Sequence, residues 1–201
     1  MAVSSVEDWG DRFLAALFAS KARIAVLRVF LVDPRRAYYQ RQIAAAAGLA
    51  LRGVQAELER LTQSGLLYRR TEGKRAYYRV DLNFSYFHEL RSMVLKSGTD
   101  YDRLRGYLAM VETIHLAFLH EPTNRVLAVT RDANRTTLST PKTYILHVMT
   151  GESFADALHH RDSELTPFLA EGVDLLGRRD DIIWHRIQRC GYDVPRGKGV
   201  P

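Results

Sequence analysis

Two stretches of helical periodicity, separated by a short turn that begins with a glycine, constrain the fold of this chain more than any other feature. The first stretch covers residues 40–47 and ends at Gly48. In the second stretch, residues 51–63, apolar side chains recur at i, i+4 and i+7 and so share one helix face: Val54, Leu58 and Leu61. Gly65 then predicts the end of the second helix, because glycine readily adopts the left-handed conformation found there.

Two short apolar runs after Gly65 predict a β-hairpin. Residues 66–70 and 75–80 are rich in Leu, Tyr or Val, and a Glu-Gly-Lys turn at residues 72–74 joins them. Helix, tight turn, helix and basic hairpin together predict a helix-turn-helix with a wing. In such a module the second helix enters the major groove of DNA, and the hairpin tip lies along the phosphates.

The distribution of charge agrees with this interpretation. The chain has a formal net charge of +6, but residues 21–80 contain thirteen Lys and Arg against four Asp and Glu, a net charge of +9. The rest of the chain is therefore net acidic. A basic module joined to a mildly acidic remainder is typical of a nucleic-acid-binding domain linked to a partner or sensor domain.

Short motifs in residues 19–96 follow one another in a fixed order. They are Ile43-Ala44 in the first helix, Gly48-Leu49 at the turn, Val54-Gln55 and Leu58-Glu59-Arg60-Leu61 in the second helix, Gly65-Leu66-Leu67, and an Arg-rich wing ending in Tyr77-Tyr78. This order resembles the winged-helix module of arsenic-repressor-like (ArsR-type) transcription regulators. The resemblance implies a sequence-specific, double-stranded-DNA-binding repressor that acts as a homodimer. The alternatives are a small helical domain that binds no DNA, and a winged helix that binds protein.

Nine side chains of the module are the candidate DNA contacts. Arg52, Gln55 and Ala56 are expected to face base edges, since Arg can bond guanine, Gln can bond adenine and an Ala methyl can touch thymine. The others are expected to contact phosphates or groove walls: Arg41, Gln42, Arg60, Arg70, Lys74 and Arg75. Such phosphate contacts supply much of the affinity and make it salt-dependent.

Flanking stretches predict further helices around this module. Residues 6–19 carry apolar side chains at helical spacing, and Ser20 is a suitable N-cap for a helix that stops before Pro34. Residues 84–96 predict another helix, rich in aromatic side chains. That helix either forms the dimer interface, since aromatic residues are enriched at interface cores, or packs on its own domain.

A Ser-Gly-Thr-Asp sequence at residues 97–100 marks a domain boundary, so the first domain is residues 1–97 and the second is residues 98–201. In the second domain, apolar runs predict strands at 114–119, 126–130 and 144–149, an extended piece at 172–176, and helices at 101–111, 153–160, 164–170 and 180–190. The glycines and prolines from residue 191 onward predict a frayed tail. The predicted fold class is α+β: a winged helix-turn-helix followed by a small α/β domain.

Residues 103–177 carry a second pattern, in the order Ile114-His115-Leu116-Ala117-Phe118, a strand at 126–129, a strand at 144–149 followed by Ser153-Phe154, then Pro167-Phe168-Leu169 and Glu171-Gly172-Val173. This layout is similar to a minimal nucleotidyltransferase domain. That family holds phosphates on a Gly-Ser turn and Mg²⁺ on a D-x-D pair. Here His120-Glu121-Pro122 replaces the turn, and the next strand opens with Asn124-Arg125.

These departures predict a degenerate domain without catalytic residues, cofactor or enzyme activity, which dimerises or receives a small-molecule or protein effector. The alternative is a minimal nucleotidyltransferase enzyme fused to a nucleic-acid-binding module. The histidines and acids at 147, 156, 159, 160 and 162 could form a metal site or be ordinary surface residues. Because His159 and His160 are adjacent, they would point about 100° apart on a helix, and no metal site is predicted.

The single cysteine, Cys190, excludes an internal disulfide and fits a reducing compartment. No secretory signal precedes the first helix, and no apolar stretch approaches the roughly 20 residues that span a bilayer. The sequence therefore predicts a cytoplasmic protein that has no membrane partner.

Overall fold

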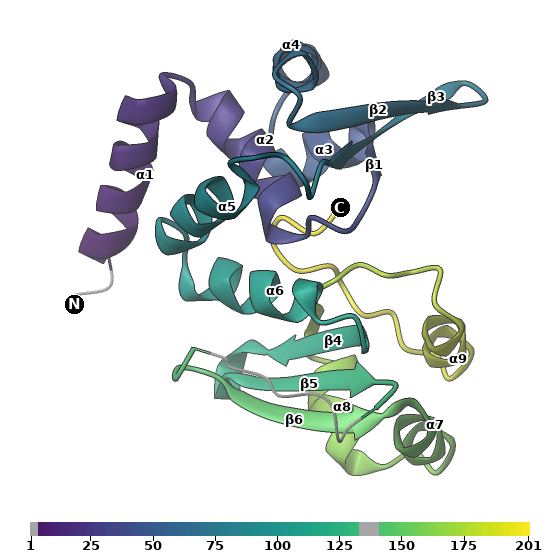
Figure 1. Ribbon diagram of the computed structural model, residues 1–201. Helices are drawn as coiled ribbons and strands as arrows, with labels where there is room; N and C mark the ends of the chain where they lie inside the picture. The colour runs from purple at the N-terminus through teal and green to yellow at the C-terminus, as the bar shows by residue number, and fades with distance from the viewer. Residues whose placement is uncertain (1–3, 133–140) are drawn as a thin grey trace. The chain divides into compact units, whose positions relative to one another are not determined.

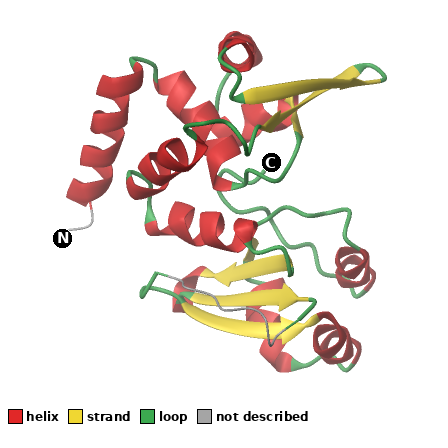
Figure 2. Cartoon of the chain, viewed as in Figure 1, coloured by secondary structure: helices red, strands yellow, loops and turns green. Residues whose placement is uncertain are grey.

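The computed structural model describes residues 4–132 and 141–201 (Figure 1). Helices and strands are mixed in an α+β arrangement (Figure 2), and the chain divides into two compact units, Met1–Gly106 and Tyr107–Val200. The division falls inside helix α6 (Asp100–Met110), after the boundary expected at residues 97–100.

The first turns of α6 belong to the first unit because they pack tightly on the preceding helix. Arg91 donates a hydrogen bond of 2.7 Å from Nη2 to the carbonyl oxygen of Gly106. A Cβ atom at position 106 would lie only 2.7 Å from Leu95, so glycine allows the two helices to approach closely here.

The first unit contains the elements that the sequence predicts. Its helices are α1 (Ser4–Phe18), α2 (Lys21–Val32), α3 (Gln40–Ala47), α4 (Leu51–Gln63) and α5 (Phe87–Lys96). Its antiparallel sheet has the order β1-β3-β2, with β1 (Tyr38–Tyr39), β2 (Leu67–Glu72) and β3 (Arg75–Val80). The predictions for α3, α4 and the hairpin are confirmed; β1 was not predicted.

Local signals in the sequence account for the bounds of these elements. The Ser20 hydroxyl caps α2 by accepting a 3.1 Å hydrogen bond from the backbone nitrogen of Arg23. Gly48 ends α3 with φ of 65°, and Gly65 follows α4 with φ of 81°. The left-handed region favours glycine because it has no Cβ. In the hairpin, Glu72 pairs with Arg75, which leaves a two-residue turn at its tip.

Helix α2 lies at the centre of the first core. Its side chains at Val26, Phe30 and Leu31 are fully buried, and the helix packs against α3, α4 and α5. The predicted apolar face of α4 is also buried, through Val54, Leu58 and Leu61. Tyr38 is buried too, edge-on to the ring of Phe30, and its hydroxyl donates to the carbonyl oxygen of Asp33 at 3.2 Å.

The second unit is built on a mixed sheet of order β6-β5-β4-β7, with β4 (Ile114–His120), β5 (Arg125–Thr130), β6 (Ile145–Thr150) and β7 (Val173–Asp174). Strand β5 runs parallel to β6, whereas β4 is antiparallel to both of its neighbours. The helices are α7 (Gly151–His159), the short α8 (Thr166–Leu169) and α9 (Ile182–Arg189). In the core, the ring of Phe118 makes stacked contacts with the rings of Phe154 and Trp184, at centroid distances of 6.3 and 6.2 Å.

The prediction of a frayed tail after residue 191 is wrong. Val194 is fully buried in the same core as Trp184. The backbone nitrogen of Asp174 donates to Pro195 O at 2.8 Å, and Gly197 N donates to Asp174 O at 2.9 Å. Glycine and proline set the composition of this segment, but the buried Val194 side chain and these backbone hydrogen bonds hold it on the unit.

Candidate nucleic-acid interface

Helix α4 presents a polar face to solvent because its apolar face is buried. Arg52, Gln55 and Ala56 are all exposed and lie at i, i+3 and i+4, on the side away from the core. The structure therefore brings the three expected base-contacting side chains together on one face. Arg41, on the first turn of α3, is also exposed.

The hairpin presents its own cations to solvent. All of them are exposed: Arg69, Arg70, Lys74, Arg75 and Arg79. The Arg75 guanidinium lies over the ring of Tyr39, 5.3 Å from its centroid, which limits its range of positions. Arg70 forms a 3.1 Å ion pair with Glu72, but the two side chains are 81% and 52% exposed, so solvent makes this pair weak.

A hollow of about 370 Å³ lies between α4 and the sheet of the first unit. Its lining residues are Gln40, Gln55, Glu59, Thr62, Gln63, Arg69 and Tyr78. Within it, Gln55 Nε2 donates to Gln40 Oε1 at 3.2 Å, and Gln40 Nε2 donates to the Tyr78 hydroxyl at 3.2 Å. A chain of hydrogen bonds thus ties Gln55 on α4 to α3 and β3.

Sequence reasoning missed this arrangement. Gln40 opens α3 directly before Arg41, and nothing in its spacing indicates that it contacts Gln55, fifteen residues away. Arg69 shares the hollow, although only its neighbour Arg70 was among the candidates. The alternation of side chains along β2 could have placed these two arginines on opposite faces of the strand.

Two further candidates, Gln42 and Arg60, also have partners within the unit. The side-chain oxygen of Gln42 accepts a 3.1 Å hydrogen bond from the backbone nitrogen of Tyr39, so Gln42 caps the start of α3 and is half-buried. Arg60 donates from Nη1 to Glu57 at 2.8 Å, yet its side chain remains 58% exposed.

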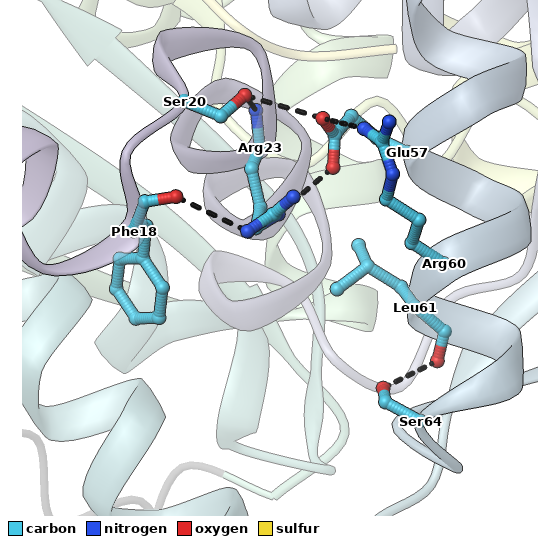
Figure 3. A network of polar contacts seen from close by, with 7 residues as sticks. All are labelled: Phe18, Ser20, Arg23, Glu57, Arg60, Leu61 and Ser64. Atoms are coloured by element: carbon cyan, nitrogen blue, oxygen red, sulfur yellow. Dashed lines mark hydrogen bonds and ion pairs between the residues drawn. The ribbon is translucent and has the colours of Figure 1, made fainter.

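The partner of Arg60 is a buried acid on the inner side of α4 (Figure 3). The Glu57 side chain is only 4% exposed, and its carboxylate accepts hydrogen bonds from Arg23 Nε at 2.9 Å and from Ser20 Oγ at 3.2 Å. Arg23 also donates to the carbonyl oxygen of Phe18 at 3.1 Å. The network therefore links the end of α1, the start of α2 and the middle of α4.

The sequence did contain a signal for Glu57. It lies three residues after Val54 and one before Leu58, on the buried stripe of α4. Burial would raise the pKa of this carboxyl, but hydrogen bonds and charges from Arg23, with further contributions from Ser20 and Arg60, outweigh burial and lower the pKa. Glu57 is therefore an ionised acid that balances arginine charge inside the unit.

In the second unit, the strands that carry the nucleotidyltransferase-like pattern are joined by a 3₁₀ turn, Glu121–Thr123. His120 is buried, with Nδ1 2.7 Å from Thr123 Oγ1 and Nε2 3.3 Å from Glu171. Strand β5 then opens with Arg125, whose Nε donates to His147 Nε2 at 3.2 Å. A cation thus occupies the region where that family carries its acidic pair.

His159 and His160 are neighbours on the chain, and their ring centroids lie 5.3 Å apart. His160 contacts the backbone oxygen of Asp156 at 2.8 Å rather than its carboxylate. Across residues 4–132 and 141–201, no group of three or more His, Cys, Asp or Glu side chains is placed to hold a metal ion.

Within those same ranges, no helix combines the length and the apolar character that crossing a membrane would require. The chain was also compared with models of protein families, with curated proteins and with solved structures. None of the three comparisons gives a match.

Proposed function

We propose that this chain is a sequence-specific, double-stranded-DNA-binding transcription regulator of the ArsR-like winged-helix type, and that it acts as a homodimeric repressor. The observation that carries the proposal is the pairing of an exposed polar face on α4 with an exposed cationic hairpin in the same unit. An α-helix and a narrow basic ribbon are shapes suited to a groove and to the phosphates beside it.

In the proposed complex, α4 lies in the major groove. Arg52 bonds a guanine through two nitrogens, Gln55 bonds an adenine, and the Ala56 methyl contacts a thymine. The hydrogen bond from Gln55 to Gln40 uses one amide hydrogen, so its other hydrogen and its carbonyl oxygen remain for the base.

The phosphates are contacted from both sides of α4. Arg70, Lys74 and Arg75 reach the backbone from the hairpin, and Arg41 reaches it from the start of α3. Arg60 stays bonded to Glu57 through one nitrogen, and its exposed edge contacts a phosphate. Gln42 holds the start of α3 and contributes to binding by positioning Arg41.

The proposed homodimer gives two such modules, which would read two half-sites. Exposed apolar side chains in the first unit support an interface between copies: Phe13 is 39% and Leu17 54% exposed on α1, and Tyr86, before α5, is 65% exposed. Binding over a promoter would then exclude the polymerase, which is the simplest form of repression.

We propose that the second unit has no catalytic role and that the protein acts in the cytoplasm without a membrane partner. The turn at Glu121–Thr123 and the cation at Arg125 argue against phosphoryl transfer by the second unit. Its role would be to receive an effector that changes DNA binding.

The test is DNA binding by the full chain. Sites would be selected from a random duplex library, and fluorescence anisotropy would compare selected with scrambled duplexes at about 50 and 200 mM salt. We expect tight, salt-sensitive binding to selected sites, which weakens in Arg52→Ala but not in Arg189→Ala, an exposed arginine of the second unit. Failure to retain any duplex at low salt would overturn the proposal, and label transfer from a nucleotide with Mg²⁺ would favour the enzyme.

A further inference from the structure

A second hollow, of about 420 Å³, lies entirely within the second unit. It is lined by His115, Thr130, Arg131, Thr150, Gly151, Glu152, Ala155, Ile182, Ile183 and Arg186. Thr130 and Thr150 are paired residues at the carboxyl ends of the parallel strands β5 and β6. Open sheets commonly bind ligands at this edge, and the volume is within the range of small-molecule sites.

One cation of the hollow is held in place by a chain of hydrogen bonds. His115 Nδ1 lies 2.9 Å from Asp181 Oδ2, and Arg131 Nε donates to His115 Nε2 at 2.6 Å. This geometry fits a neutral imidazole with its proton on Nδ1, donated to Asp181. Asp181 is itself fixed, because its other carboxylate oxygen accepts from Ile183 N at 2.8 Å. Arg131 is thus oriented through Nε, which leaves its terminal nitrogens to face a ligand.

The second cation, Arg186, comes from α9 and is exposed at the same hollow. Backbone donors add to the positive character. The Thr150 hydroxyl accepts from Ser153 N at 3.1 Å, so the N–H groups of Gly151 and Glu152, at the first turn of α7, have no partner inside that helix. Two arginines and the first turn of α7 thus line one hollow, where their positive character would stabilise an anionic group.

The remaining walls are apolar and acidic. Ala155, Ile182 and Ile183 supply an apolar surface, and Ile182 is 75% exposed beside the arginines. Gly151 lets α7 begin close to α9, since a Cβ there would lie 3.1 Å from Ile183 Cδ1. Glu152, an exposed lining residue, would repel a second anionic group on a ligand.

We propose that this hollow binds a small organic molecule with a single anionic group, a phosphate monoester or a carboxylate, joined to an apolar body. Arg131 and Arg186 bond the anionic group, and the apolar body lies on Ile182 and Ile183. His115 is a positioning residue that acts through Arg131. Among the residues that the structure describes, none from the first unit lines the hollow, so this proposal does not depend on DNA binding.

Isothermal titration of the full chain, without DNA, tests the site. The probes are phenyl phosphate, benzoate and benzyl alcohol, which share a ring and differ in the charged group. We expect saturable binding of phenyl phosphate or benzoate, with one molecule per chain, and no saturable binding of benzyl alcohol. The anion that binds more tightly identifies the phosphate or the carboxylate class.

Substitutions of single arginines test whether the anion binds in this hollow. Arg186→Gln and Arg131→Gln should each weaken the anion by about tenfold or more, the effect of losing a charge-assisted hydrogen bond. The matched control is Arg189→Gln, an exposed arginine on the same helix that does not line the hollow, and its affinity should equal that of the wild type. Circular dichroism and melting temperatures establish that each variant is folded.

Three outcomes would overturn the proposal: neither anion binds, benzyl alcohol binds as tightly as the anions, or Arg189→Gln weakens binding as much as Arg186→Gln. These three titration results do not depend on whether the chain binds DNA. A failure of this ligand site can therefore be distinguished from a failure of the proposed DNA interface.

Discussion

The carboxylate of Glu57 on α4 lies 2.9 Å from Nε of Arg23 on α2, although the two residues are 34 positions apart in the chain (Figure 3). The same carboxylate bonds Arg60, on the turn of α4 that follows it. Helix α4, which is proposed to enter the major groove, is therefore held on α2 by an ion pair as well as by apolar packing. Because the Glu57 carboxylate is buried, removing one of its partners takes away a hydrogen bond that solvent cannot readily replace.

Loss of the Glu57 charge should destabilise the first unit. We expect Glu57→Gln to lower the free energy of unfolding by about 2–3 kcal/mol, the cost of losing charge-assisted hydrogen bonds at a site where Arg23 keeps some access to water. Urea titrations followed by circular dichroism would measure it. The control is Glu59→Gln, whose side chain is exposed two positions along the helix and should change stability by less than about 0.5 kcal/mol. Equal losses in the two variants would contradict the role of the Glu57 network.

The same network should make stability depend on pH. Because the pKa of Glu57 is lowered in the folded protein, its contribution is fully present above the unfolded pKa of about 4.3 and is lost as pH falls through the folded value. The stability gap between wild type and Glu57→Gln should therefore be constant from pH 7 to about pH 5 and shrink below it. A gap that stays constant down to pH 3 would mean that Glu57 does not act through its charge.

Gln40 should influence sequence readout although it is not itself proposed to touch a base. It holds Gln55 through a 3.2 Å hydrogen bond and is held by Tyr78. Gln55→Ala should cost about 1–3 kcal/mol on the matched site and relax discrimination at one base pair. Gln40→Ala should relax the same position by a smaller amount, and the double variant should lose little more than Gln55→Ala alone. Fluorescence anisotropy on matched and mismatched duplexes measures these losses. If the losses of the two single variants add up in the double variant, Gln40 does not act through Gln55.

Lys74, at the hairpin tip, should contribute affinity without specificity. We expect Lys74→Ala to weaken binding to selected and scrambled duplexes by the same factor, and to reduce the slope of log affinity against log salt by about one. Titrations at several salt concentrations measure both quantities. A loss confined to selected duplexes would show instead that Lys74 reads bases.

Local patterns explain why much of the first unit could be predicted from the sequence. Gly48 and Gly65 end or follow helices with positive φ, and the apolar spacing of α4 is set by one helix alone. Neither signal needs a distant partner. The hairpin likewise depends on residues close in sequence, from β2 to β3.

The features that could not be predicted from the sequence depend on contacts between residues that are far apart in the chain. The place of Glu57 on the apolar stripe of α4 indicates its burial, but no local spacing indicates that its partner is Arg23, 34 positions away. The candidate anion site joins His115, Arg131, Thr150 and Arg186 from separate elements, and no local spacing relates them. In the same way, Val194 is one apolar residue among glycines and prolines, and only the core of the second unit explains its burial.

The burial of Val194 in the segment after residue 191 can be tested directly. A frayed segment would tolerate Val194→Ala with almost no effect, whereas the buried side chain predicts a loss of about 2 kcal/mol in local stability. Hydrogen exchange should therefore speed up by more than about tenfold at the amides of Asp174 and Gly197, which donate to Pro195 and Asp174. The control is Gln188→Ala, an exposed change on α9 that should leave both amides protected. If Asp174 and Gly197 exchange at the same rate in Val194→Ala as in the wild type, Val194 does not anchor the tail.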